Sequence, residues 1–201
     1  MTTRLSEYFN LHFYKSTIPA VLIALIIAPC TILFPARYGF ENGPIENLQI
    51  FVLLATAIIA FCARNNKKLF IFVGLIIIAL LLRETSYGRT LFFAVPNTEN
   101  KFYKWTEIKY GWLAHPIYGL FLLSTATYFI LNKLHRNILQ IIHTSKIPFW
   151  NTLMLLSGLI LGIFAEKIMH NTIFEEMSEL LFYTALCGII YIYANKNFAP
   201  R

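Results

Sequence analysis

Glu166 and His170 are the pair of residues with the clearest chemical potential, because they lie four positions apart in an apolar part of the chain. Four residues are close to one turn of helix, so the carboxylate and the imidazole share one helix face. Such a pair can chelate a divalent metal ion or relay a proton. Gly158 and Gly162 continue the same spacing, and small residues in a stripe let a second helix approach closely. The pattern predicts a tight helix contact that ends in a metal or proton-transfer site.

A second group of acidic residues follows a few positions later. Glu176, Glu179 and Tyr183 are spaced to share one face of a helix, and Glu175 is one turn before Glu179. The connection to the helix that carries Glu166 is short, so the two helix ends are expected to be neighbours. The combined constellation comprises Glu166, His170, Glu175, Glu176 and Glu179.

Glu84 and Glu166 each lie at the carboxyl end of a predicted helix, where the helix dipole disfavours an anion. Each therefore needs a nearby cation or hydrogen-bond donor. Arg83 is adjacent to Glu84, but neighbouring residues point about 100° apart on a helix, so we expect partners on other helices. Charges near membrane depth are usually paired inside the bundle and mark functional sites. The alternative is a structural ion-pair lock between helices.

These residues predict an enzyme site that acts on a lipid or lipid-linked headgroup. Its catalytic groups would be Glu84, Glu176, Glu179 and Arg83, with Glu176 or Glu179 as the general base. A divalent metal ion, the one cofactor that the pattern indicates, would be held by His115, Glu166 and His170. The headgroup would contact Arg89, Glu46 and Tyr87. The alternatives are a metal-free acid–base site with Arg83 as the anion holder, an interfacial role for His115, and an aromatic belt that includes Tyr87.

The elements that must position these residues are membrane spans. The chain has 201 residues, of which 57% are hydrophobic and 13% charged, and its mean hydropathy is +0.59. A water-soluble globule is excluded, since soluble domains carry about 25% charged residues. We expect an all-α polytopic transmembrane bundle that forms one integral membrane domain over residues 1–201. Six apolar runs of nearly membrane-spanning length are expected to cross the bilayer, at 17–35, 45–63, 69–86, 112–132, 149–168 and 176–194.

The distribution of charge predicts the orientation of these spans. Ten of the seventeen lysines and arginines fall in terminal segments and connections that share one side when both termini are cytoplasmic, as the positive-inside rule requires. The net charge of +7 is thus explained by membrane orientation, and nucleic acid is not an expected partner. All ten acidic residues are glutamate, and only Glu7 falls on the cytoplasmic side in this topology. The chain is predicted to be a multi-pass protein of the cell inner membrane with a polar layer at the outer boundary.

The sequence leaves the type of function open. The expected partners are membrane lipids, but a proton- or cation-coupled carrier and a noncatalytic membrane subunit are alternatives. The carrier is weakened by the near absence of charge in the middle of the spans. The connection at 133–146 is expected to be a polar link. The enzyme hypothesis makes one structural prediction, which is that Glu84, Glu166, His170 and Glu179 converge in one cavity that opens to the outer leaflet.

Overall fold

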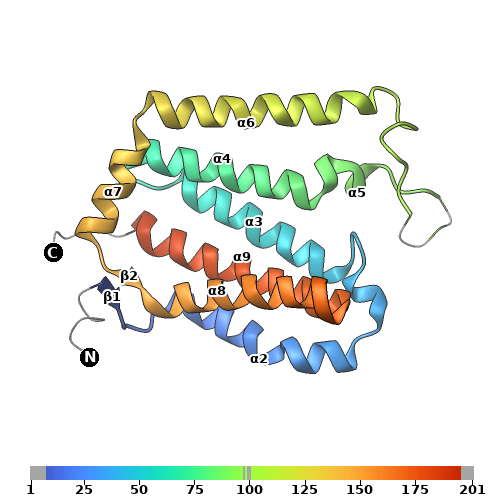
Figure 1. Cartoon of the computed structure of the whole chain (residues 1–201), viewed down its shortest axis with the longest axis horizontal. Coiled ribbons are helices and arrows are strands. Elements are labelled where there is room, and N and C mark those ends of the chain that lie inside the picture. Colours follow the sequence, from blue (N-terminus) through green and yellow to red (C-terminus); the bar gives the residue numbers. More distant parts are fainter. Residues whose placement is uncertain (1–7, 97, 99–100, 196–201) are drawn as a thin grey trace.

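The structure is a computed structural model that describes residues 8–96, 98 and 101–195, and it confirms the predicted all-α bundle (Figure 1). The long helices are α2 (Ile18–Leu33), α3 (Pro44–Phe61), α4 (Lys67–Glu84), α6 (Ala114–Leu131), α8 (Phe149–Phe164) and α9 (Thr172–Asn195). Shorter elements are α5 (Arg89–Phe92), α7 (Leu134–Thr144), and the strands β1 (Phe9–Asn10) and β2 (Ile147–Pro148).

Five helical segments in the described part of the chain are long and apolar enough to cross a membrane. A sixth candidate segment is α4 followed by Ser86–Phe92, a pair that bends by 61°. Successive spans run in opposite directions, so the start of α2 and the end of α9 lie at the same end of the bundle as α7 (Figure 1). We call this the α7 end, and the opposite end, where α5 lies, the α5 end. The protein is therefore a multi-pass membrane protein. The start of α2 and the end of α9 lie on the same side of the membrane.

Helix α9 is the centre of the bundle, and 61% of its most apolar 18-residue window is buried inside the protein. One apolar cluster on α9, which includes Ile173 and Leu181, packs against Ala20 and Ile27 of α2. A second cluster joins α9 to α3 and α4 through Leu53, Phe70, Ile77 and Ile190. The glutamates of α9 are consequently held between neighbouring helices near the α5 end.

The predicted close approach along the glycine stripe is confirmed at Gly158. A β-carbon at this position would lie 2.7 Å from the backbone nitrogen of Phe182 and 2.9 Å from the carbonyl oxygen of Ser178. At Gly162 the nearest such atom is 3.9 Å away, so α8 diverges from α9 toward the α5 end. Helix α8 thus packs its glycine face directly on the backbone of α9.

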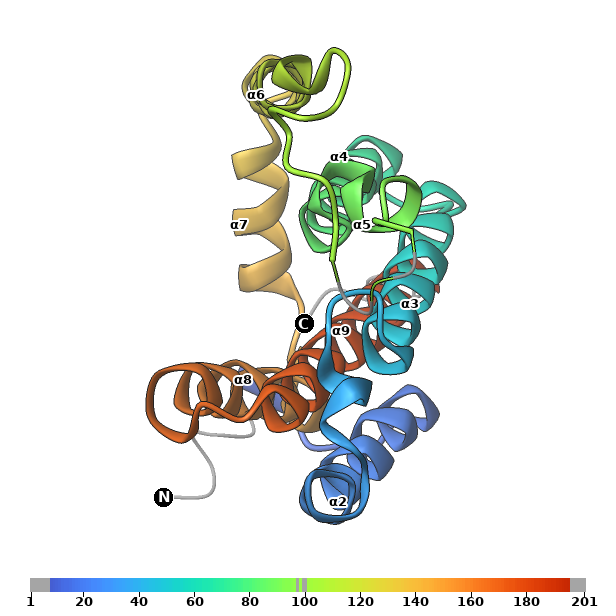
Figure 2. The same ribbon diagram turned by 90° about the vertical axis from the view of Figure 1, so that its right-hand side faces the viewer.

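The predicted polar link at 133–146 is wrong, because most of this segment is helix α7. Figure 2 shows that α7 runs roughly perpendicular to α6 and carries the chain from α6 to α8. Leu134, Ile138 and Ile141 are spaced on one face of α7 and are at least partly buried, whereas His135 and Arg136 are exposed. An amphipathic helix of this kind is typical of the membrane interface.

Helix α6 lies at the edge of the bundle, and only 6% of its most apolar window is buried inside the protein. An apolar groove of about 420 Å³ separates it from α4, with Phe72 and Ile76 on one wall and Leu122 and Phe129 on the other. The groove thus exposes part of α4, the helix that ends at Glu84, to the surrounding membrane.

Candidate functional site

Three helices bring polar residues together near the α5 end. Helix α3 contributes Glu46 and Gln49 in its first two turns, α4 contributes Arg83 and Glu84 in its last turn, and α9 contributes Glu176, Glu179 and Tyr183. These seven residues are called the carboxylate network below. They assemble because α3 and α9 start at the end of the bundle where α4 finishes.

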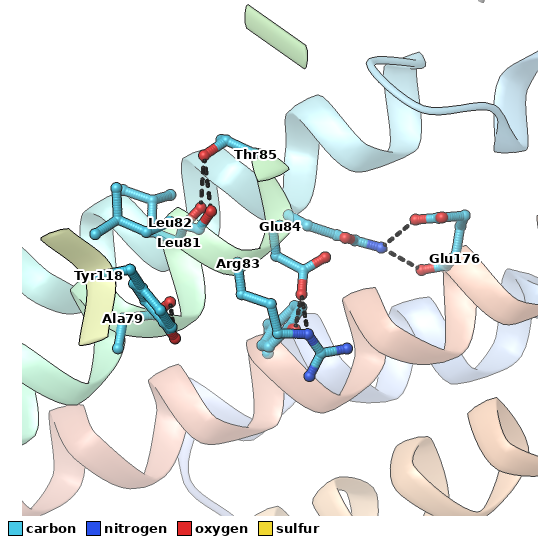
Figure 3. A network of polar contacts seen from close by, with 10 residues as sticks. Ala79, Leu81, Leu82, Arg83, Glu84, Thr85, Tyr118 and Glu176 are labelled. Carbon is cyan, nitrogen blue, oxygen red and sulfur yellow. Dashed lines mark hydrogen bonds and ion pairs between the residues drawn. The ribbon is translucent and has the colours of Figure 1, made fainter. Parts of the chain in front are cut away.

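Glu84 is fixed by a residue of another helix. The Tyr183 hydroxyl donates a 2.6 Å hydrogen bond to Glu84 Oε1, and Arg83 Nε lies 3.9 Å from the same oxygen (Figure 3). The side chain of Glu84 is 10% exposed, and Tyr183 is buried. The expected partner for Glu84 on another span is therefore confirmed. A hydrogen bond of this kind orients the carboxylate and leaves Oε2 to face other groups.

Gln49 connects α3 to α9. Its Nε2 donates hydrogen bonds of 2.8 Å to Glu176 Oε2 and of 2.8 Å to the Glu176 carbonyl oxygen (Figure 3). Gln49 is fully buried, and its Oε1 has no hydrogen-bond partner among the described residues. The network thus contains a buried acceptor that a ligand or water could satisfy.

Glu46 and Glu179 complete the network. Glu46 is 5% exposed and accepts a hydrogen bond from the backbone N–H of Asn42, which anchors it at the start of α3. The carboxylate of Glu179 interacts electrostatically with the Arg83 guanidinium and with the carboxylates of Glu84, Glu175 and, most weakly, Glu166. No hydrogen bond to the Glu179 side chain is found within the part of the chain that the structure describes. A carboxylate without a hydrogen-bond partner therefore lies near one that Tyr183 holds in place.

Arg83 differs from the acids of the network because its side chain is 64% exposed. Its terminal nitrogens point away from Glu84 in Figure 3. Only the Glu84 carboxylate lies within ion-pair distance of Arg83 among the described residues, at 3.9 Å. The outer atoms of the guanidinium are available to an anionic group from outside the protein.

The structure does not assemble the predicted metal ligands His115, Glu166 and His170. Within residues 8–96, 98 and 101–195, no group of three or more histidine, cysteine or acidic side chains could hold a metal ion. Glu166 is exposed and pairs with its neighbour Lys167 at 2.5 Å, so its expected partner on another span is also wrong. The prediction of one cavity containing Glu84, Glu166, His170 and Glu179 is corrected, because Glu166 and His170 are exposed.

The physical reason is a change in helix geometry. Helix α8 ends at Phe164, and Ala165–Met169 form a π-helical turn, after which His170 adopts a left-handed conformation with φ of 50°. A π turn contains more residues than an α turn, so the four-residue spacing no longer keeps side chains on one face. The stripe that begins at Gly158 is broken before it reaches Glu166.

His115 and Tyr87 belong to an aromatic cluster. The Tyr87 ring lies 5.2 Å from the His115 ring and 4.8 Å from the Tyr118 ring, measured between centroids, and Trp105 lies 6.2 Å from His115. This favours the interfacial interpretation of these residues over metal or headgroup binding. The cluster also places Tyr118 of α6 next to the end of α4.

Arg89 is engaged within the protein. Its Nη2 lies 3.4 Å from Glu41 Oε2, and its guanidinium lies 5.7 Å from the centroid of the Phe102 ring. The contact with Glu41 ties α5 to the connection between α2 and α3, and the contact with Phe102 ties it to the segment between α5 and α6. Of the two arginines expected to bind a headgroup, Arg83 alone keeps an exposed, largely uncommitted side chain.

Two network residues, Gln49 and Tyr183, are absent from the predicted site. The sequence contained a signal for each, since Gln49 shares a helix face with Glu46 and Tyr183 shares one with Glu179. Their contacts join residues more than ninety positions apart, so spacing along one helix did not identify their partners.

The fold and this geometry define a class: a multi-pass α-helical membrane protein with a largely buried carboxylate network at one end of the bundle. Comparison with protein-family models, with curated proteins and with solved structures finds no match to this chain.

Proposed function

We propose that the protein is a membrane enzyme that hydrolyses or transfers a phosphate-bearing headgroup of a lipid or lipid-linked substrate. The observation that carries this proposal is the arrangement around Glu84. An oriented carboxylate at Glu84 and an exposed guanidinium at Arg83 lie together at the end of α4, and the Glu179 carboxylate interacts electrostatically with both. Paired carboxylates supply general acid–base catalysis, and a guanidinium binds phosphate through two parallel N–H donors.

Each residue receives one role in this proposal. Arg83 holds the phosphate, and Glu84, oriented by Tyr183, accepts the proton of a water or of an acceptor hydroxyl. The deprotonated oxygen attacks phosphorus, the bond from phosphorus to the leaving oxygen breaks, and Glu179 protonates that oxygen. The proton taken up by Glu84 then returns to Glu179, which restores both groups.

The groove between α4 and α6 supports a lipid substrate. Phe72 and Ile76 line the groove, and both share one face of α4 with Arg83 because the spacings are four and eleven residues. Phe72 is about 16 Å from Arg83 along the helix axis at 1.5 Å per residue. Half of the hydrocarbon core of a bilayer is about 15 Å thick. A chain from one leaflet would therefore extend along this face with its headgroup at Arg83.

The carrier alternative receives less support from the same structure. Below the carboxylate network, toward the α7 end, the buried surfaces of α3, α4 and α9 include Leu53, Ile77 and Ile190, and the buried polar residues there, Thr56 and Thr184, are uncharged. A proton- or cation-coupled carrier requires ionisable groups that continue toward the other side of the membrane. The positive-inside rule assigns the α7 end to the cytoplasm, so we place the network at the outer face of an inner membrane.

The proposal is tested with purified protein reconstituted into vesicles of a total polar lipid extract. Mass spectrometry over time should reveal a phosphate-bearing lipid that is consumed by the wild type and preserved by Glu84→Gln. The loss of rate should be about 100-fold or more, the range of a general acid–base group. Arg83→Gln should raise the lipid concentration needed for half-maximal rate. Identical lipid profiles for wild type and Glu84→Gln would overturn the proposal.

A further inference from the structure

A second cavity lies toward the α7 end, on the opposite side of α9 from the groove described above. Its volume is about 440 Å³, within the range of about 300 to 1,000 Å³ that is typical of ligand pockets. Its walls come from α2, α3 and α9 and are mostly apolar, with Phe51 and Val52 among them. None of the seven residues of the carboxylate network lines it.

The cavity contains polar atoms that the protein does not satisfy. Ser16 and Thr184 are among the residues that line it, and the hydroxyl oxygen of each is buried and has no hydrogen-bond partner among the described residues. Thr184 is 8% exposed, so its hydroxyl is removed from bulk solvent. Buried hydroxyls are normally hydrogen-bonded, and two unpartnered hydroxyls beside one cavity, one in the turn before α2 and one on α9, indicate a ligand with acceptor oxygens.

Lys15 gives the cavity a charge. It is one of the residues that line the cavity, its side chain is exposed, and no acidic partner is found for it in the part of the chain that the structure describes. It precedes α2, so it is placed where the first span enters the membrane. A lysine at this position attracts the anionic headgroups of the adjacent leaflet.

The depths of these groups match one type of molecule. The backbone of Ser16 is next to Gly188, since a β-carbon at Gly188 would lie 2.8 Å from the Ser16 carbonyl oxygen. Thr184 is four residues from Gly188 on α9, which is about 6 Å farther into the membrane. Lys15 and Ser16 thus lie nearer the α7 end than Thr184 does, and most of the remaining cavity wall is apolar.

We propose that this cavity binds one anionic phospholipid of the leaflet at the α7 end. Its phosphate pairs with Lys15, its ester oxygens accept hydrogen bonds from Ser16 and Thr184, and an acyl chain packs against Phe51 and Val52. The site is separate from the carboxylate network and does not depend on the function proposed for it.

The test uses native mass spectrometry of the full-length protein released from nanodiscs that contain equal amounts of phosphatidylglycerol and phosphatidylcholine with identical acyl chains. The wild type should retain one phosphatidylglycerol in preference to phosphatidylcholine. Lys15→Gln should weaken this preference about fivefold, the effect of one lysine charge beside an anionic surface. Lys67→Gln is the matched control, because it removes a lysine from the same end of the bundle without altering the cavity, and it should keep the preference.

Two further variants test the inside of the cavity. Thr184→Val removes the hydroxyl at nearly constant volume and should reduce retention, and Ala55→Leu fills space beside Val52 and should also reduce it. Circular dichroism verifies that each variant retains the helical content of the wild type. Equal retention of the two lipids by the wild type would overturn the proposal. A phosphatidylglycerol preference that persists unchanged in Lys15→Gln and Thr184→Val would also overturn it.

Discussion

The hydrogen bond from Tyr183 to Glu84 leads to a quantitative prediction about the carboxylate network. Tyr183→Phe removes only the hydroxyl that lies 2.6 Å from Glu84 Oε1, while the buried ring keeps its packing. Hydrogen bonds between helices in membranes contribute about 0.6 kcal/mol on average and about 1.7 kcal/mol at most. Bonds to charged groups contribute about 1.5 to 3 kcal/mol in proteins generally. A short bond to a carboxylate should therefore contribute about 1.5 kcal/mol.

A double-mutant cycle isolates this contribution. The free energy of unfolding is measured in mixed micelles by titration with a denaturing detergent for wild type, Tyr183→Phe, Glu84→Ala and the double variant. The coupling energy should be about 1.5 kcal/mol, because each single change already removes the bond. Tyr118→Phe is the matched control. The Tyr118 hydroxyl donates only a 3.3 Å bond to the Ala79 carbonyl oxygen, so its coupling to Glu84→Ala should be small.

A coupling energy below about 0.3 kcal/mol for Tyr183 and Glu84 would refute this reasoning, since independent sites add to within about 0.3 to 0.5 kcal/mol. It would mean that Tyr183 does not hold the carboxylate. Glu84 would then lack the orientation that the proposed base requires.

Three more predictions concern the contacts that position the network. Gly158→Ala should lower the free energy of unfolding by about 1 to 3 kcal/mol, because the added carbon meets the backbone of α9. Gly162→Ala is the matched control and should not destabilise the protein, and unfolding in a denaturing detergent measures the free energy for both variants. Gln49→Leu should cost about 1 to 3 kcal/mol in the same assay by leaving Glu176 without its donor, and a cost near zero would contradict the contact. Glu166→Gln should change the free energy of unfolding by less than about 0.5 kcal/mol, because the pair of Glu166 with the adjacent lysine is exposed. The content of bound metal, measured by elemental analysis, should be the same in this variant as in the wild type.

The features that the sequence predicted correctly are those encoded in local periodicity. The apolar runs located the five helical segments that are long enough to cross a membrane and the bent segment that begins with α4. Helix α9 begins at Thr172, so Glu176 and Glu179 lie within the helix rather than at its start. The close approach at Gly158 followed from four-residue spacing. Glu84 was identified because an anion at a helix carboxyl end needs a partner.

The errors occurred where periodicity changes or where contacts are remote. The spacing of Glu166 and His170 assumed a regular α-helix, and the π turn at Ala165–Met169 invalidates that assumption. Helix α7 was not predicted because the polar residues of this segment favoured a link between spans, although Leu134, Ile138 and Ile141 recur at helical spacing. The hydrogen bond of Tyr183 joins α9 to α4 and depends on how these helices pack, which no single-helix pattern specifies.

The most direct test of the proposed function is the initial rate of lipid conversion in reconstituted vesicles, compared between Glu84→Gln and Glu166→Gln. Both variants replace a glutamate near the α5 end, but Glu84 is 10% exposed within the network and Glu166 is 51% exposed outside it. We expect a loss of about 100-fold or more for Glu84→Gln and a rate within about twofold of wild type for Glu166→Gln. Equal rates for the two variants would contradict it.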